Sequence, residues 1–226
     1  RNINEQDLLN KEQREIGYFL NSVFEDHFHG SGHWENAPMY RVIMSLIRKR
    51  PRDLVKLCTL AARRAYSNGH NRILTNDLES IFRNYSNDRL TDTSTEYKSE
   101  LPKIQELLLK MKPSAKELES SSPCLFNRGQ LLKKLENILS MSNFSFRDGK
   151  AVTADSLAAF LYKINFITAR KTVGDEILRV YYDEAQYIYN SFADFGYSYE
   201  IHPAYRWALQ PSSKNLFRQI ELLESK

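Results

Sequence analysis

The run Arg50-Pro51-Arg52-Asp53-Leu54 begins the segment that most constrains how this chain folds. Proline at a first helical position has its φ angle preset and lacks an amide hydrogen that would have no partner there. The leucine- and alanine-rich residues that follow predict a helix. Gly69 is well placed to end it, because glycine readily adopts the left-handed conformation found after a helix C-terminus. We therefore expect a helix over 50–69.

This helix is predicted to be amphipathic. At about 100° per residue, one side carries an apolar stripe made of Leu54, Leu57, Cys58, Ala61 and Ala65. Arg52, Lys56 and Arg63 fall on the opposite side. The helix is thus expected to bury one face and to present a line of positive charge that an anionic partner could meet.

Composition limits the class of protein. The 226 residues suffice for one large or two small domains, and the hydrophobic content of 42% is that of a globular protein. Only 8 glycines and 7 prolines favour long helices over a sandwich or barrel. The net charge of +4 permits an anionic partner without requiring one.

Other features bear on cellular location. Cys58 and Cys124 are far apart, which argues against a disulfide framework and favours a reducing, cytoplasmic compartment. No apolar run approaches the roughly 20 residues that a membrane span needs, so no membrane association is expected. The chain starts at Arg1 and enters a helical pattern at once, which predicts a fragment of a longer protein.

Apolar periodicity predicts a helical first half. Helices are expected over 4–25, 38–49, 50–69 and 75–85, followed by a long polar helix or helix pair over 86–112 that is interrupted near Pro102. Thr75 or Asn76 is the expected N-cap of the fourth helix. The Ser-, Pro- and charge-rich stretch that follows predicts a linker over 113–126 between domains 1–112 and 127–226.

The second half has a different pattern. Helices are expected over 129–141 and 153–165, then strands over 166–171 and 177–182, an aromatic-rich segment over 187–199, and short helices over 203–209 and 212–223. In the second strand, Leu178, Val180 and Tyr182 are predicted to be buried, in alternation with exposed residues. Two helices followed by a small β-ribbon is the order of a winged-helix domain. The predicted fold class is mainly α with such a domain at its end.

No catalytic motif is present. Gly149-Lys150 lacks the upstream glycine and the following Ser or Thr of a phosphate-binding loop. A dinucleotide fingerprint, a nucleophile elbow and an HExxH zinc motif are also absent from the sequence. Whether the chain belongs to an enzyme is left open, and any part it plays in one is expected to be non-catalytic.

The 50–54 run, its alanine-rich helix and Ile73-Leu74-Thr75-Asn76-Asp77-Leu78 resemble the helical lid of AAA+/STAND-type P-loop ATPases. These include origin-recognition-like proteins and a group of bacterial ATPases. Their lids carry an arginine at a helix start and then an Ile-Thr-x-x-Asp signal, although here Asp77 comes one residue early. A winged-helix domain follows the lid in several such families, and residues 161–167 and 201–206 are similar to its segments.

The resemblance implies that Arg52, with Arg50 beside it, contacts the γ-phosphate of ATP held by an upstream P-loop ATPase core. ATP would then be a cofactor only together with that core. A guanidinium suits this role because it is permanently charged and forks onto phosphate oxygens. Read from the residues alone, Arg50 and Arg52 could instead be solvated or paired with Asp53 and nearby carboxylates.

A winged-helix domain suggests contact with DNA through its second helix and wing. On that helix Asp155, Ala158, Ala159, Tyr162 and Lys163 are predicted to face outward, which offers one acid and one base. Non-specific DNA contact or protein docking is therefore favoured over sequence readout. The candidate binding residues are the cations of these helices and of the wing: Lys56, Arg63, Lys133, Lys134, Lys163, Arg170 and Lys171.

The predicted function is a regulatory region that couples nucleotide sensing to binding of nucleic acid or a protein partner. One alternative is a protein–protein interaction module without nucleotide, in which the basic helix meets an acidic partner. A second is a metal-dependent hydrolase that uses His27, His29 and His33. Because such spacing in a polar loop is typical of a solvated turn, no metal is assigned.

Overall fold

The computed structural model describes residues 13–30, 34–48, 50–120, 122–173, 176–193 and 195–209. Within them the chain is mainly α-helical with a small antiparallel sheet near its C-terminal end, which confirms the predicted fold class. No helix in these ranges is both long and apolar enough to cross a membrane. The helices are α2 (Gln13–Leu20), α3 (Met39–Leu46), α4 (Pro51–Ser67), α5 (Thr75–Tyr97), α6 (Ile104–Lys110), α7 (Ala115–Leu118), α8 (Arg128–Met141), α9 (Ala154–Lys163), α10 (Gln186–Asn190) and α11 (Pro203–Leu209).

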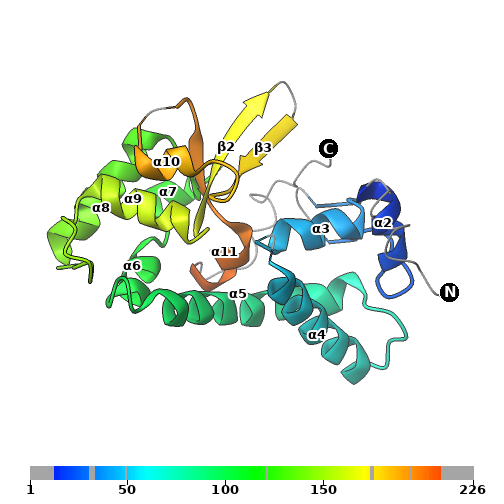
Figure 1. The fold of residues 1–226 in the computed structure, drawn as a ribbon. Coiled ribbons are helices and arrows are strands. Elements are labelled where there is room, and N and C mark those ends of the chain that lie inside the picture. The colour runs from blue at the N-terminus through cyan, green and yellow to red at the C-terminus, as the bar shows by residue number, and fades with distance from the viewer. Residues whose placement is uncertain are drawn as a thin grey trace.

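Helix α5 runs along one side of the molecule and connects its two ends (Figure 1). Helices α2, α3 and α4 lie at one end, and α6, α8, α9 and α10 lie at the other. Between them α11 packs against α5 and α3. There Trp207 lies 4.6 Å from Phe82 and 5.9 Å from Trp34, measured between ring centroids. The C-terminal helix thereby completes the core of the N-terminal helices.

Helix α4 has the bounds that its sequence predicts. Pro51 is its first residue, and Gly69 follows its end with φ of +73°, a conformation that favours glycine. The predicted apolar stripe faces inward: Leu57 and Ala61 are fully buried, and the other members are buried or half-buried.

The predicted cap of α5 is wrong. Neither Thr75 nor Asn76 caps the helix, because the carboxylate of Asp77 accepts the backbone N–H of Leu74 at 3.0 Å. The hydroxyl of Thr75 donates instead to Glu25 at 2.8 Å, so it joins α5 to the chain after α2. The helix then continues without a break to residue 97, well past the end that the local pattern suggested.

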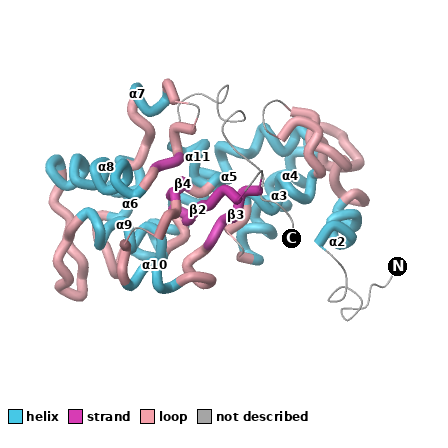
Figure 2. Tube along the Cα trace, turned by 90° about the horizontal axis from the view of Figure 1, so that it is seen from above, coloured by secondary structure: helices cyan, strands magenta, loops and turns pink. Residues whose placement is uncertain are grey.

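The strands are β1 (Leu125–Phe126), β2 (Ile167–Val173), β3 (Glu176–Val180) and β4 (Ser198–Ile201). They form one antiparallel sheet in the order β1-β4-β2-β3, and Figure 2 shows it near the middle of the molecule. The succession α8, α9, β2, β3 is the one expected for a winged-helix module. Strand β4, which the sequence analysis did not predict and which overlaps the end of the aromatic-rich segment, lies between β1 and β2.

The proposed linker over 113–126 contains α7 and β1, and the division into domains 1–112 and 127–226 stays a prediction. The expected final helix over 212–223 lies outside the described residues, as does the start of the expected helix over 4–25.

The predicted alternation of β3 is wrong. Leu178 is 40% exposed, whereas Arg179 and Tyr181, which were expected to face solvent, are buried. Arg179 can be buried because its Nε donates to the carboxylate of Glu200 on β4. The alternation of polar and apolar residues therefore misassigned the two faces of this strand.

Candidate anion-binding site

The start of α4 lies over a buried ionic cluster. Arg48 donates through Nε to Asp53 at 2.7 Å and through Nη1 to the hydroxyls of Thr93, at 2.8 Å, and Tyr205. Arg89 also donates to Asp53, and both guanidinium groups are buried. Burial by itself would raise the pKa of Asp53, but the two cations lower it. Both arginines thus belong to the core and are closed to a ligand.

Arg50 and Arg52 lie outside this cluster and share Glu96 of α5. Arg50 Nη1 donates to Glu96 at 2.9 Å, and its Nη2 donates to the hydroxyl of Tyr97 at 3.2 Å. Arg52 reaches the same carboxylate at 3.4 Å, which is long for a hydrogen bond, and 62% of its side chain is exposed. Arg50 is therefore occupied, while Arg52 retains donors that a ligand can reach.

Arg52 opens onto a shallow groove on the outer side of α4. The groove has a volume of about 440 Å³ and is lined by Arg52, Val55, Lys56, Thr59, Leu60 and Arg63 of α4, together with Asp88 of α5. Lys56 pairs with Asp88 across it at 2.8 Å. The structure thus brings together three predicted site residues, Arg52, Lys56 and Arg63, beside exposed apolar surface at Val55.

The remaining predicted cations do not form one surface with these. They are distributed over α8 (Lys133, Lys134), α9 (Lys163) and β2 (Arg170, Lys171). Three have carboxylate partners within the chain: Lys134 with Glu117 at 2.7 Å, Lys163 with Glu100 at 2.6 Å and Arg170 with Glu200 at 3.7 Å. Lys133 and Lys171 are exposed.

Helix α9 does not have the outward face predicted for it. Ala158, Ala159 and Tyr162, all expected to face solvent, are buried at 0%, 7% and 0% exposure. The helix packs against α8, α10 and β2, and α10 comes from the aromatic-rich segment whose position the sequence did not predict. A helix covered in this way has no free face to place in a DNA groove.

A second buried ionic cluster, which sequence reasoning missed, lies in the sheet. Glu200 accepts from Arg179 and, at 3.0 Å, from Arg206. Burial opposes ionisation, but the two guanidinium groups lower the pKa of Glu200 to about 2. Burial also lowers the pKa of His202 to about 3, with nearby arginines adding to the effect, and its Nδ1 accepts the N–H of Ala204 at 3.1 Å. The sequence signal was present, since these charged residues interrupt apolar segments.

The histidines of the loop after α2 are separate from this site. His27 and His29 are exposed, and the Nε2 of His29 lies 3.6 Å from Glu25. His33 lies outside the described residues. In the described ranges, no group of three or more His, Cys, Asp or Glu side chains is arranged to hold a metal ion.

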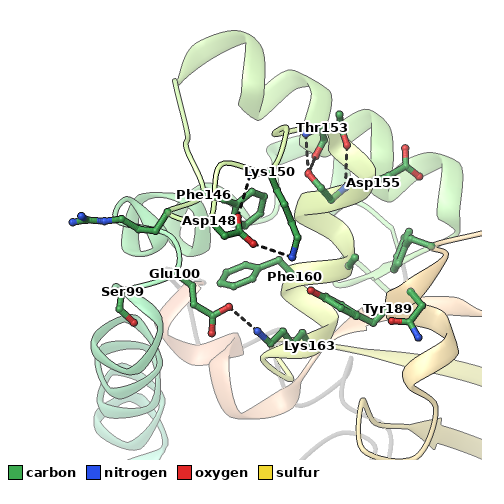
Figure 3. Close-up of a pocket in the computed structure, with 15 residues that line it drawn as sticks. Ser99, Glu100, Phe146, Asp148, Lys150, Thr153, Asp155, Phe160, Lys163 and Tyr189 are labelled. Carbon is green, nitrogen blue, oxygen red and sulfur yellow. Dashed lines mark hydrogen bonds and ion pairs between the residues drawn. The ribbon is translucent and has the colours of Figure 1, made fainter.

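A larger cavity lies at the other end of α5. Its volume is about 670 Å³, and its walls come from the residues just after α5, the loop over 146–153, α9, and α10 with the residues that follow it. In Figure 3 the side chains of Lys150 and Lys163 approach Phe160 from two sides, paired with Asp148 at 2.9 Å and Glu100 at 2.6 Å. No local pattern predicted this cavity, because its lining is drawn from segments between residues 99 and 192.

Comparison with known proteins gives one match. A family model described as the FunZ-associated C-terminal helical domain matches residues 7–94, which is less than half of the chain and includes α4 and most of α5. Its description names no ATPase. No curated protein and no solved structure matches the chain.

Proposed function

We propose that the N-terminal helices accompany a nucleotide-binding P-loop core and that Arg52 contacts the γ-phosphate of ATP held by that core. The family model supports only the idea that these helices accompany another domain or protein, because the helical domain is named as FunZ-associated. The resemblance of the 50–78 region to an ATPase lid supplies the second part. In this proposal the cofactor is ATP, bound between this chain and the core.

The observation that carries the proposal is the difference between Arg52 and its two neighbouring arginines. Arg48 is buried against Asp53, and Arg50 is held by Glu96 and Tyr97. Arg52 is 62% exposed and holds the shared carboxylate only weakly, at 3.4 Å. Its guanidinium can therefore turn to a phosphate without breaking the core.

The buried cluster offers a route from this position to the C-terminal half. Arg48, four residues before Arg52, donates to Tyr205 of α11, and α11 directly follows β4 and His202. A shift of the α4 N-terminus on nucleotide binding would displace Tyr205, because a packed core transmits small movements. Nucleotide binding would in this way change the packing of α11 against the sheet.

A protein partner is favoured over DNA for the C-terminal half. Lys134 and Arg170 are neutralised by carboxylates of the chain, Lys163 lies in the wall of the cavity beyond α5, and α9 is covered. Phosphate-driven binding needs a continuous group of free cations. Binding to a 20-base-pair duplex whose affinity falls steeply between 50 and 200 mM salt would overturn this choice and favour DNA.

The sensor assignment is tested by ATP turnover of the protein as encoded, with its nucleotide-binding partner. We expect Arg52→Ala to lower turnover by at least about tenfold. Arg52→Lys should retain part of the turnover, because an ammonium keeps the positive charge but lacks the paired donors with which a guanidinium binds two phosphate oxygens. Arg64→Ala is the matched control, an exposed arginine of α4 outside the groove. Unchanged turnover in Arg52→Ala would overturn the assignment, as would a protein that neither binds nor hydrolyses ATP.

A further inference from the structure

The cavity at the far end of α5 is built by contacts that fix its walls. The backbone N–H of Arg147 donates to the carbonyl of Glu100 at 3.0 Å, which ties the 146–153 loop to the residues after α5. Phe146 packs edge-on against Phe160 at 5.5 Å between centroids, and Phe160 packs likewise against Tyr97 at 6.2 Å. A volume of about 670 Å³ lies in the range of small-molecule sites.

Polar groups gather on one part of this aromatic lining. Figure 3 shows Lys150 and Lys163 on two sides of Phe160, with the side chain of Tyr189 directed toward the region between them. Tyr189 lies near enough to both lysines to raise the pKa of each. The hydrogen bond to Asp148 raises the pKa of Lys150, and that to Glu100 raises the pKa of Lys163 against the opposing effect of burial, so both lysines are charged at neutral pH.

The balance of donors and acceptors favours an anion. Both oxygens of Asp148 already accept a hydrogen bond, from the ammonium and from the backbone N–H of Lys150. A third lining carboxylate, Asp155, accepts from Arg128. Each lysine ammonium carries three N–H donors and uses one on its carboxylate. The Lys150–Asp148 pair is more than half exposed and the Lys163–Glu100 pair is partly exposed, so both are screened by water and can open to a ligand.

We propose that this cavity binds a small aromatic anion, a flat ring system that bears one carboxylate or phosphate group. The ring packs mainly against the partly exposed Phe146, beside the buried Phe160, and the anionic group accepts from Lys150, Lys163 and the hydroxyl of Tyr189. The aromatic lining selects the flat body, while the convergent donors select the charge. The proposal does not depend on nucleotide sensing by Arg52.

The test uses probes that share one ring system and differ in charge: 2-naphthoate, 2-naphthyl phosphate, the neutral 2-naphthamide and the cationic 2-naphthylmethylamine. Calorimetric titration of the full chain is expected to give the two anions at least about tenfold higher affinity than the amide, and no binding of the amine. Acetate and inorganic phosphate, which lack the ring, are expected not to bind. The ratio of the two naphthyl anions separates carboxylate from phosphate preference.

Variants locate the binding. Lys150→Met and Lys163→Met should each lower the affinity for the anions by about tenfold and leave that for 2-naphthamide unchanged. Lys133→Met, at an exposed position of α8 outside the cavity, is the control. Ala159→Trp should fill the cavity and abolish binding of every probe, and Asn190→Trp at its rim replaces that variant if it fails to fold.

Three results would overturn the proposal. The first is failure of both naphthyl anions to bind at 1 mM, a concentration well above the dissociation constant expected for such a site. The second is equal affinity for the anionic and neutral probes. The third is unchanged anion binding in both lysine variants.

Discussion

Helices α4 and α9 both contain alanines and both show the apolar periodicity of an amphipathic helix, yet they differ in how much of their surface is buried. Helix α4 buries Leu57, Ala61 and Ala65 and leaves its other side to solvent. Helix α9 buries seven of its ten residues, among them Ala158 and Tyr162. The difference comes from the neighbours: α4 lies at one end of the molecule, whereas α8, α10 and β2 surround α9. Amphipathic patterning identifies a helix but does not say how many of its sides other elements will cover.

The N-terminal helices and the sheet nevertheless share one arrangement. Each buries a carboxylate between arginines, Asp53 between Arg48 and Arg89 among the helices and Glu200 between Arg179 and Arg206 at the sheet. In each case one arginine is close to the carboxylate in sequence, whereas the other, Arg89 or Arg179, comes from a distant segment. The ionic clusters therefore fix tertiary contacts, α4 to α5 and α11 in the first case and β3 to β4 in the second.

The sharpest test of the helix comparison introduces the same side chain into both helices. Ala158→Lys in α9 should cost more than about 4 kcal/mol of unfolding free energy, because it overpacks a filled core and buries an unpaired ammonium. Ala62→Lys on the exposed side of α4 should stay within about 0.5 kcal/mol. Urea denaturation of both variants checks this, and similar losses in the two would contradict the described burial of α9.

A smaller effect distinguishes the buried from the exposed ion pairs of α4. Asp53→Asn should destabilise the protein by about 3–5 kcal/mol, because it leaves Arg48 buried without a counter-charge and removes one of the two carboxylates that pair with Arg89. Asp88→Asn, which removes the half-exposed partner of Lys56, should cost less than about 1 kcal/mol. Chemical denaturation midpoints at an unchanged m-value measure both. A cost for Asp53→Asn no larger than that for Asp88→Asn would show that the cluster is open to solvent.

Acid should lower the free energy of unfolding through Glu200 and His202, which lie at the sheet. The pKa of Glu200 is lowered from 4.5 to about 2, so its stabilisation is present above pH 4.5 and is lost toward pH 2, a change of about 3 kcal/mol. The pKa of His202 is lowered from 6.5 to about 3, so stability also falls as the pH drops below 6.5. Denaturation at stepped pH should show both windows.

A variant separates the two windows of this titration. His202→Asn, whose side-chain oxygen can accept the N–H of Ala204, should flatten the stability profile between pH 6.5 and 4.5 and keep the loss at lower pH. A profile already flat between pH 6.5 and 4.5 in the unsubstituted protein would mean that His202 is not held neutral in the folded state.

The sequence by itself determined the elements whose signals are local. Pro51 and Gly69 set the bounds of α4, the leucine and alanine spacing set its buried stripe, and Pro203 set the start of α11. These features depend on residues within a few positions of one another. The cation line Arg52, Lys56, Arg63 was predicted for the same reason, since helical spacing alone places these residues on one side.

Only the tertiary structure decided which charges are available. Arg48, Arg50 and Arg52 are close in sequence, yet they differ in exposure because Tyr205 approaches Arg48, and Glu96 approaches Arg50, from distant segments of the chain. Contacts between distant segments also bury Arg179, cover α9 and form the cavity next to Phe160. Burial of a charged group depends on whether a distant partner offsets its lost hydration, and that partner's position is a property of the assembled fold.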